Sequence, residues 1–167
     1  LDLIDVRSFS SLWYWVVLVL AWLLVNHSVL GVPLDVILRA RRGGEQAAAD
    51  LQDAARIEVG RILRVADASG PWVVGVGAFA LSALLVLAVW HRVELAQAVL
   101  LLLAPLALVA ALSVRAARRI EAARPDAAEL ARLLLRHRLW TQGVGFAAIF
   151  VTALFGMVHN LAALRAW

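Results

Sequence analysis

Four long apolar stretches dominate this sequence and limit the folds open to it. They cover residues 12–30, 71–90, 95–114 and 140–161, and none has an Arg, Asp or Glu in its middle. A helix needs about 20 such residues to cross the hydrocarbon core of a bilayer. Lipid cannot satisfy backbone hydrogen bonds, and the alternation typical of barrel strands is absent. The sequence therefore predicts an all-α integral membrane four-helix bundle in a single domain.

Composition excludes several kinds of chemistry. The chain is 63% hydrophobic, which is more apolar surface than a soluble domain of 167 residues can bury. It has no cysteine, so disulfides, thiolate catalysis and cysteine-ligated metal centres are excluded. All sixteen basic residues are arginine, and without lysine no Schiff base can form. We expect a protein that is not an enzyme and carries no cofactor or metal.

The arginines predict an orientation. Thirteen of the sixteen fall in two segments, residues 32–70 and 115–139, which join alternate pairs of apolar stretches. The positive-inside rule makes these segments cytoplasmic loops and both termini periplasmic, in a bacterial inner membrane. This explains the basic pI without a nucleic-acid partner. The arginines next to the apolar stretches are expected to set the topology: Arg39, Arg41, Arg42, Arg115, Arg118 and Arg119.

Aromatic residues stand where the predicted spans begin or end. Interfacial tryptophans anchor membrane helices at the level of the lipid headgroups. Trp72 and Trp90 bracket the second span, and eighteen residues of helix cover about 27 Å. We expect membrane anchoring by Trp13, Trp15, Trp72, Trp90 and Trp140.

The two arginine-rich segments are expected to be helical in part. From about residue 45 to 66, Leu51, Ala55, Val59 and Ile62 form an apolar stripe at helical spacing. Such an amphipathic helix either lies on the bilayer or packs on a partner. Residues 94–123 have no internal glycine and predict a helix longer than the bilayer. With the Arg-Pro-Asp turn that follows, they form the first arm of a long helical hairpin.

A short pattern occurs twice, 68 residues apart. Trp72, Gly75, Gly77 and His91 return as Trp140, Gly143, Gly145 and His159. The repeat indicates two tandem helical hairpins, or else a chance match between sequences of low complexity. In either case we expect the four glycines, Gly75, Gly77, Gly143 and Gly145, to permit close packing between helices.

Polar residues at membrane depth are candidates for function. His91 and His159 could together ligate one b-type haem if the second and fourth spans are neighbours. The simpler interpretation places both at helix ends within reach of water, and His137 on the surface among arginines. Asn26, His27, Ser28, Thr152 and Asn160 could line a pore in a ring of copies.

Four longer stretches of the sequence carry a resemblance to a known group of proteins. Residues 7–15 (RSFSSLWYW), residues 29–35 (VLGVPLD), residues 118–122 (RRIEA) and residues 150–157 (FVTALFGM) carry a resemblance that spans most of the chain. In these stretches it resembles a group of small inner-membrane proteins of Rhodobacter-type α-proteobacteria, often labelled "component of SufBCD complex". The resemblance implies an inner-membrane location and transfers no site residue.

These observations leave three hypotheses for function. The first is a non-catalytic membrane subunit or scaffold that packs in a larger assembly or with copies of itself. The second is an oligomeric ion channel or small transporter. The third is a b-haem membrane redox protein, with His91 and His159 as ligands.

Overall fold

The computed structural model describes residues 12–27 and 30–164. In this part the chain forms five α-helices: α1 (Leu12–His27), α2 (Leu34–Arg42), α3 (Glu45–Val89), α4 (Glu94–Ala123) and α5 (Ala127–Leu164). The all-α prediction is confirmed. The bundle has five helices rather than four, because the apolar stretches belong to α1, α3, α4 and α5 and the short α2 is a separate element.

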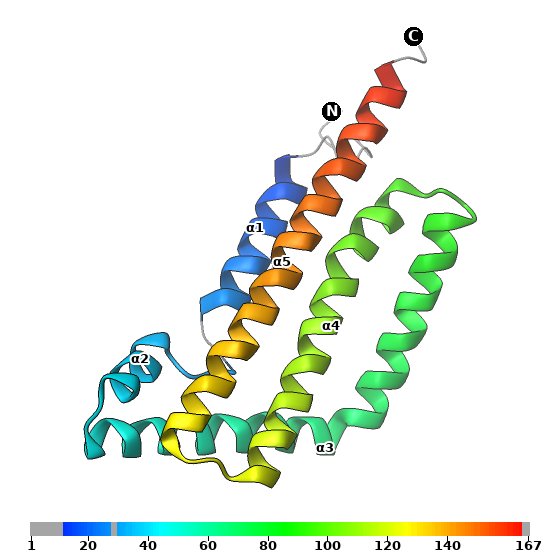
Figure 1. The fold of residues 1–167 in the computed structure, drawn as a ribbon. Helices are drawn as coiled ribbons and strands as arrows, with labels where there is room; N and C mark the ends of the chain where they lie inside the picture. The colour runs from blue at the N-terminus through cyan, green and yellow to red at the C-terminus, as the bar shows by residue number, and fades with distance from the viewer. Residues whose placement is uncertain (1–11, 28–29, 165–167) are drawn as a thin grey trace.

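Helix α3 joins two segments that the sequence separates. The amphipathic stretch and the second apolar stretch form one helix of 45 residues, with Pro71 inside it. The helix bends sharply, so that its first part runs across the ends of α4 and α5 and its second part rises beside α4 (Figure 1). Proline removes one helical hydrogen bond and crowds the preceding turn, which bends a helix. The Gly70–Pro71 pair therefore turns the helix without ending it.

Three helices are long and apolar enough to cross a membrane: α3, α4 and the part of α5 from Ala127 to Val158. Helix α1 is described over 16 residues, Leu12–His27, which lie within the predicted span of residues 12–30. Sixteen residues of helix cover about 24 Å, less than the ~30 Å of a hydrocarbon core. The chain leaves α1 through Leu30 and Gly31, both with positive φ.

Helices α4 and α5 form the predicted long hairpin. Helix α4 ends at Arg124, whose left-handed φ of 42° stops the helix. Asp126 then begins α5, since its carboxylate Oδ1 accepts a hydrogen bond of 2.7 Å from the backbone N–H of Glu129. An acidic side chain at this position satisfies a free N–H of the first turn. Helix α5 then runs on to Leu164.

The buried side chains form two separate cores. Eleven buried residues join α2, the first part of α3, the end of α4 and the start of α5, and we name them the large core. They are Leu30, Val32, Ile37, Leu51, Ala55, Val59, Ala117, Ile120, Leu130, Ala131 and Leu134. Three others, Leu18, Trp22 and Val109, form the small core between α1, α4 and α5.

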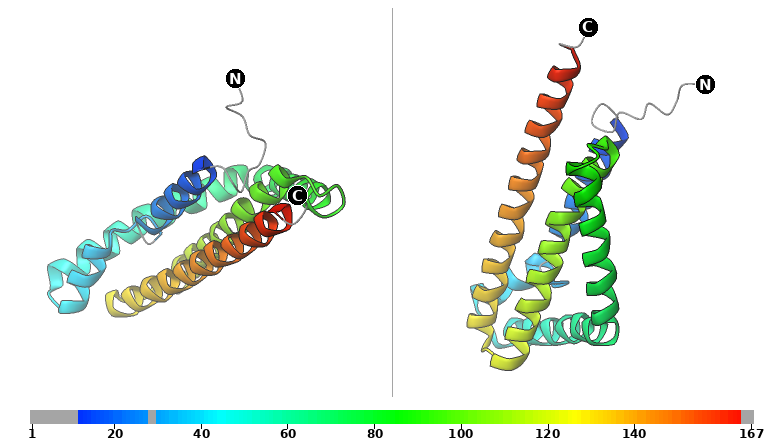
Figure 2. Two further views of the ribbon diagram at one scale, coloured as in Figure 1. Left: turned by 90° about the horizontal axis from the view of Figure 1, so that it is seen from above. Right: turned by 90° about the vertical axis from the view of Figure 1, so that its right-hand side faces the viewer.

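The large core lies at one end of the molecule, together with both arginine-rich segments. Helix α2, the first part of α3 and the turn between α4 and α5 gather there, while α1 begins and α5 finishes at the opposite end (Figures 1 and 2). We call the first the arginine-rich end. The apolar stripe of α3 is buried against the chain's own helices, since Leu51, Ala55 and Val59 are at most 2% exposed. This stripe therefore packs within the chain itself, and the prediction of a partner or of the bilayer surface stays a prediction.

Candidate functional site

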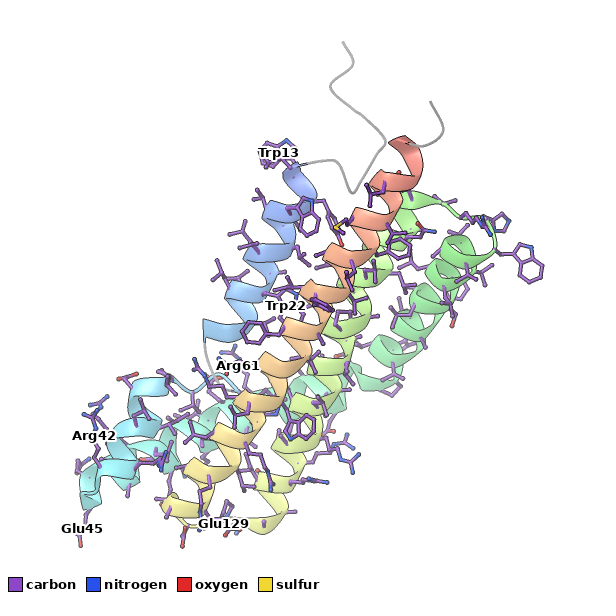
Figure 3. All side chains as sticks on the ribbon, turned by 45° about the horizontal axis from the view of Figure 1, so that its top comes forward. Trp13, Trp22, Arg42, Glu45, Arg61 and Glu129 are labelled. Atoms are coloured by element: carbon purple, nitrogen blue, oxygen red, sulfur yellow. The ribbon has the colours of Figure 1, made fainter. Side chains whose placement is uncertain are left out.

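The predicted membrane anchors are exposed at both ends of the apolar helices. Trp72 and Trp140 stand where α3 and α5 leave the arginine-rich end, and they are 79% and 65% exposed. Trp13 and Trp90 lie at the opposite end and are also exposed, whereas Trp15 is half-buried. Figure 3 shows Trp13 far from Arg42, Glu45 and Glu129. The separation suits two interfacial belts of aromatic side chains.

The arginines expected to set the topology all lie at the arginine-rich end. Arg39, Arg41 and Arg42 are in the last turn of α2, and Arg115, Arg118 and Arg119 are near the end of α4. Most ion pairs here are local, such as Asp35 with Arg39 at 3.0 Å and Asp53 with Arg56 at 3.0 Å. Asp67 of α3 reaches Arg118 of α4 at 3.5 Å. All these pairs are exposed to solvent, so each contributes little to stability.

The four glycines have different surroundings. A Cβ added to Gly145 would lie 2.9 Å from Cε3 of Trp22, so this glycine lets α1 and α5 approach closely. A Cβ on Gly75, Gly77 or Gly143 would meet no atom within 4 Å. Close packing within the chain is therefore present at Gly145 alone among these four.

Gly75 and Gly77 lie on opposite sides of α3. They are about 200° apart, because each residue of a helix turns by about 100°. On the side of Gly77, Ala88 is buried and Ala80 is half-buried toward α4. On the side of Gly75, every residue of the same helical face is exposed, and we name this the outer face of α3: Gly75, Ala78, Phe79, Ser82 and Val86.

Ser82 gives the outer face a polar group near the middle of the predicted span. Its hydroxyl makes no hydrogen bond within the described part of the chain. Ser69 and Ser113, by contrast, donate to the carbonyl oxygens four residues earlier, at 2.7 and 2.8 Å. A hydroxyl in hydrocarbon is stabilised by a partner, and serine often finds one on a neighbouring helix. The sequence places Ser82 within the second apolar stretch, and we expect it to hydrogen-bond to the backbone or to a neighbouring helix. Its exposure depends on which helices pack against α3, so local spacing does not show it.

The two histidines considered for haem belong to different elements: His91 to the turn between α3 and α4, and His159 to α5. His91 is exposed in the turn between α3 and α4. Helix α4 stands between the rising part of α3 and α5 (Figures 1 and 2). The side chain of His159 lies outside the described residues, as do those of Asn26, His27 and Asn160 and all of Ser28. Thr152 is fully buried rather than facing an open path.

Polar side chains meet at the junction of the two cores. The Ser113 hydroxyl of α4 lies 3.3 Å from Nε2 of His137 on α5, and the Thr141 hydroxyl donates to the His137 carbonyl at 3.1 Å. His137 is half-buried rather than fully exposed as predicted, with its Nε2 against the Ser113 hydroxyl. Burial lowers the pKa of His137, which precedes Trp140 and lies outside the predicted span.

In the part of the chain that the structure describes, no three His, Asp or Glu side chains come together as a metal site would require. Comparison with known protein families, with curated proteins and with solved structures finds no match for this chain.

Proposed function

We propose that the chain is a non-catalytic, multi-pass inner-membrane subunit that packs, through the outer face of α3, against a helix of another chain. The observation that carries this proposal is the unpartnered hydroxyl of Ser82 beside two small residues, Gly75 and Ala78. Small residues let helix backbones approach closely in a membrane, and a serine between them can donate a hydrogen bond across the contact.

The setting of α3 supports the same proposal. Its second part stands at the edge of the bundle and packs on α4. In the most apolar stretch of the helix, only 6% of the residues are buried. Residues 71–76 are exposed all around the helix. An edge helix with a small-residue face is accessible to a partner without rearrangement of the bundle.

The proposed orientation places the arginine-rich end in the cytoplasm. Both arginine-rich segments belong to one packed end, so they lie on one side of the membrane, and the positive-inside rule makes that side cytoplasmic. The start of α1 and the end of α5 are then periplasmic. The inner-membrane location is also supported by the resemblance to proteins of Rhodobacter-type bacteria, including those labelled as SufBCD components.

The test measures the mass of the detergent-solubilised protein by light scattering and identifies what co-purifies from native membranes. We expect a mass larger than one chain, from copies or a second subunit, and a shift toward one chain in Gly75→Leu and Ser82→Leu. Ala153→Leu is the matched control, because Ala153 is exposed on α5 and gains the same kind of bulk. A lone chain from native membranes, or equal loss in all three variants, would contradict the proposal.

A further inference from the structure

The junction between the two cores contains a cavity of about 340 Å³. Its walls come from the end of α1, the link to α2, Ile62 of α3, the middle of α4 and residues 137–141 of α5. One wall is apolar, with Leu106 and Val109 of α4, and the opposite wall carries His137, Arg138 and Thr141 of α5. The cavity lies beside the described end of α1, where Leu30 and Gly31, both with positive φ, lead toward α2.

Most polar groups of the cavity are satisfied within the chain. Ser113 donates its hydroxyl proton to the carbonyl of Val109 at 2.8 Å. The Ser113 oxygen and Nε2 of His137 are also in hydrogen-bond contact, at 3.3 Å. Thr141 donates to the carbonyl of His137. The donors left for a ligand therefore belong to Arg138.

Arg138 is half-buried, and in the described part of the chain it has neither an ion pair nor a hydrogen bond. A partly desolvated guanidinium is unfavourable unless an anion accepts its hydrogen bonds. The side chain of Glu58 lies against Gly31, which lines the cavity. Glu58 is paired with Arg61 at 3.6 Å, so it is already compensated. The cavity thus presents an uncompensated positive charge.

The depth of the cavity indicates where its ligand comes from. Arg138 precedes the exposed Trp140 by two residues, and interfacial tryptophan marks the level of lipid headgroups. On the other side, Val109 belongs both to the cavity wall and to the small core between the apolar helices. The cavity therefore spans the boundary between headgroups and acyl chains. Basic pockets between membrane helices on the cytoplasmic side bind anionic headgroups.

We propose that this cavity binds one anionic membrane phospholipid, with the Arg138 guanidinium on the phosphate and the α4 wall against the first part of an acyl chain. The volume falls in the range of small-ligand sites, which fits a headgroup and its glycerol better than a whole lipid. Arginine holds a phosphate through charge-assisted, paired hydrogen bonds. This assignment is independent of the partner contact at α3.

The experiment uses the full chain in a neutral detergent, with bound lipid counted by native mass spectrometry. Phosphatidylglycerol, phosphatidylcholine and sodium phosphate are added separately. We expect one tightly bound phosphatidylglycerol per chain, little retention of phosphatidylcholine, and no displacement by sodium phosphate at the same concentration. In Arg138→Gln, phosphatidylglycerol should bind about tenfold more weakly, as for the loss of a charge-assisted hydrogen bond.

Two further variants separate the charge from the shape of the cavity. Arg136→Gln is the matched control, because Arg136 is exposed on the same helix and does not line the cavity. It removes the same charge and should leave lipid binding unchanged. Ala110→Phe fills the apolar side, keeps Arg138 and should also weaken retention. The proposal is overturned if both arginine variants bind lipid equally, if phosphatidylcholine binds as well as phosphatidylglycerol, or if free phosphate takes the site.

Discussion

The two ends of this molecule are held together differently. At the arginine-rich end, residues from α2, α3, α4, α5 and the link that precedes α2 form the large core of eleven buried residues. Toward the opposite end only Leu18, Trp22 and Val109 form a core, and the helices expose valine, leucine and phenylalanine. Water drives apolar side chains together, whereas lipid gives them no such preference. The difference indicates that one end folds in water and the other is completed by a bilayer.

The largest expected effect comes from the large core. Leu134 is 0% exposed, and Leu134→Ala should lower the free energy of unfolding by about 2–5 kcal/mol, because it leaves a cavity among packed side chains. Unfolding is followed by circular dichroism during titration with a denaturing detergent.

Leu139 on the same helix is the control, since it is 69% exposed. Leu139→Ala should change the free energy of unfolding by no more than about 0.5 kcal/mol. Equal losses in the two variants would mean that the contrast between the ends is false.

A smaller effect is expected where α1 meets α5. Gly145→Ala places a methyl group against the ring of Trp22, and relief of that clash should cost about 1–3 kcal/mol of unfolding free energy. Gly143→Ala, on the same helix with open space around it, should be neutral or stabilising by up to about 1 kcal/mol. Thermal unfolding in detergent measures both. A more damaging substitution at Gly143 than at Gly145 would place the α1–α5 contact elsewhere.

The smallest effect is expected for the ion pair between α3 and α4. Arg118→Gln removes the contact with Asp67, but both side chains are largely exposed, at 64% and 71%. The loss should be about 0–1 kcal/mol and should shrink further in high salt. The same thermal unfolding assay, with and without added salt, checks this. A loss as large as that of Leu134→Ala would make this pair part of the fold's main support.

The sequence predicts the helices better than their packing. The hairpin of α4 and α5 and the apolar stripe of α3 depend on local spacing, and the structure confirms them. The continuity of α3 through Gly70–Pro71 was not predicted, because this pair is typical of a loop. Local patterns carry no signal for contacts between segments distant in sequence, such as Ser113 with His137 and Gly145 with Trp22. The surroundings of Arg138 depend on such contacts in the same way.

The central claim is that both arginine-rich segments lie on the cytoplasmic side and the apolar helices cross the membrane. The chain has no cysteine, so single cysteines report without background. Glu45→Cys, Glu129→Cys and His91→Cys place one exposed thiol at the start of α3, the start of α5 and the α3–α4 turn.

The deciding measurement is labelling of these three variants with a membrane-impermeant maleimide, in bacterial cells whose outer membrane has been made permeable. We predict that the cysteine at position 91 reacts, and that those at 45 and 129 react only after the inner membrane is broken. The claim is contradicted if the cysteines at positions 45 and 129 respond differently from each other. It is also contradicted if both react together with the cysteine at position 91 while the inner membrane is unbroken.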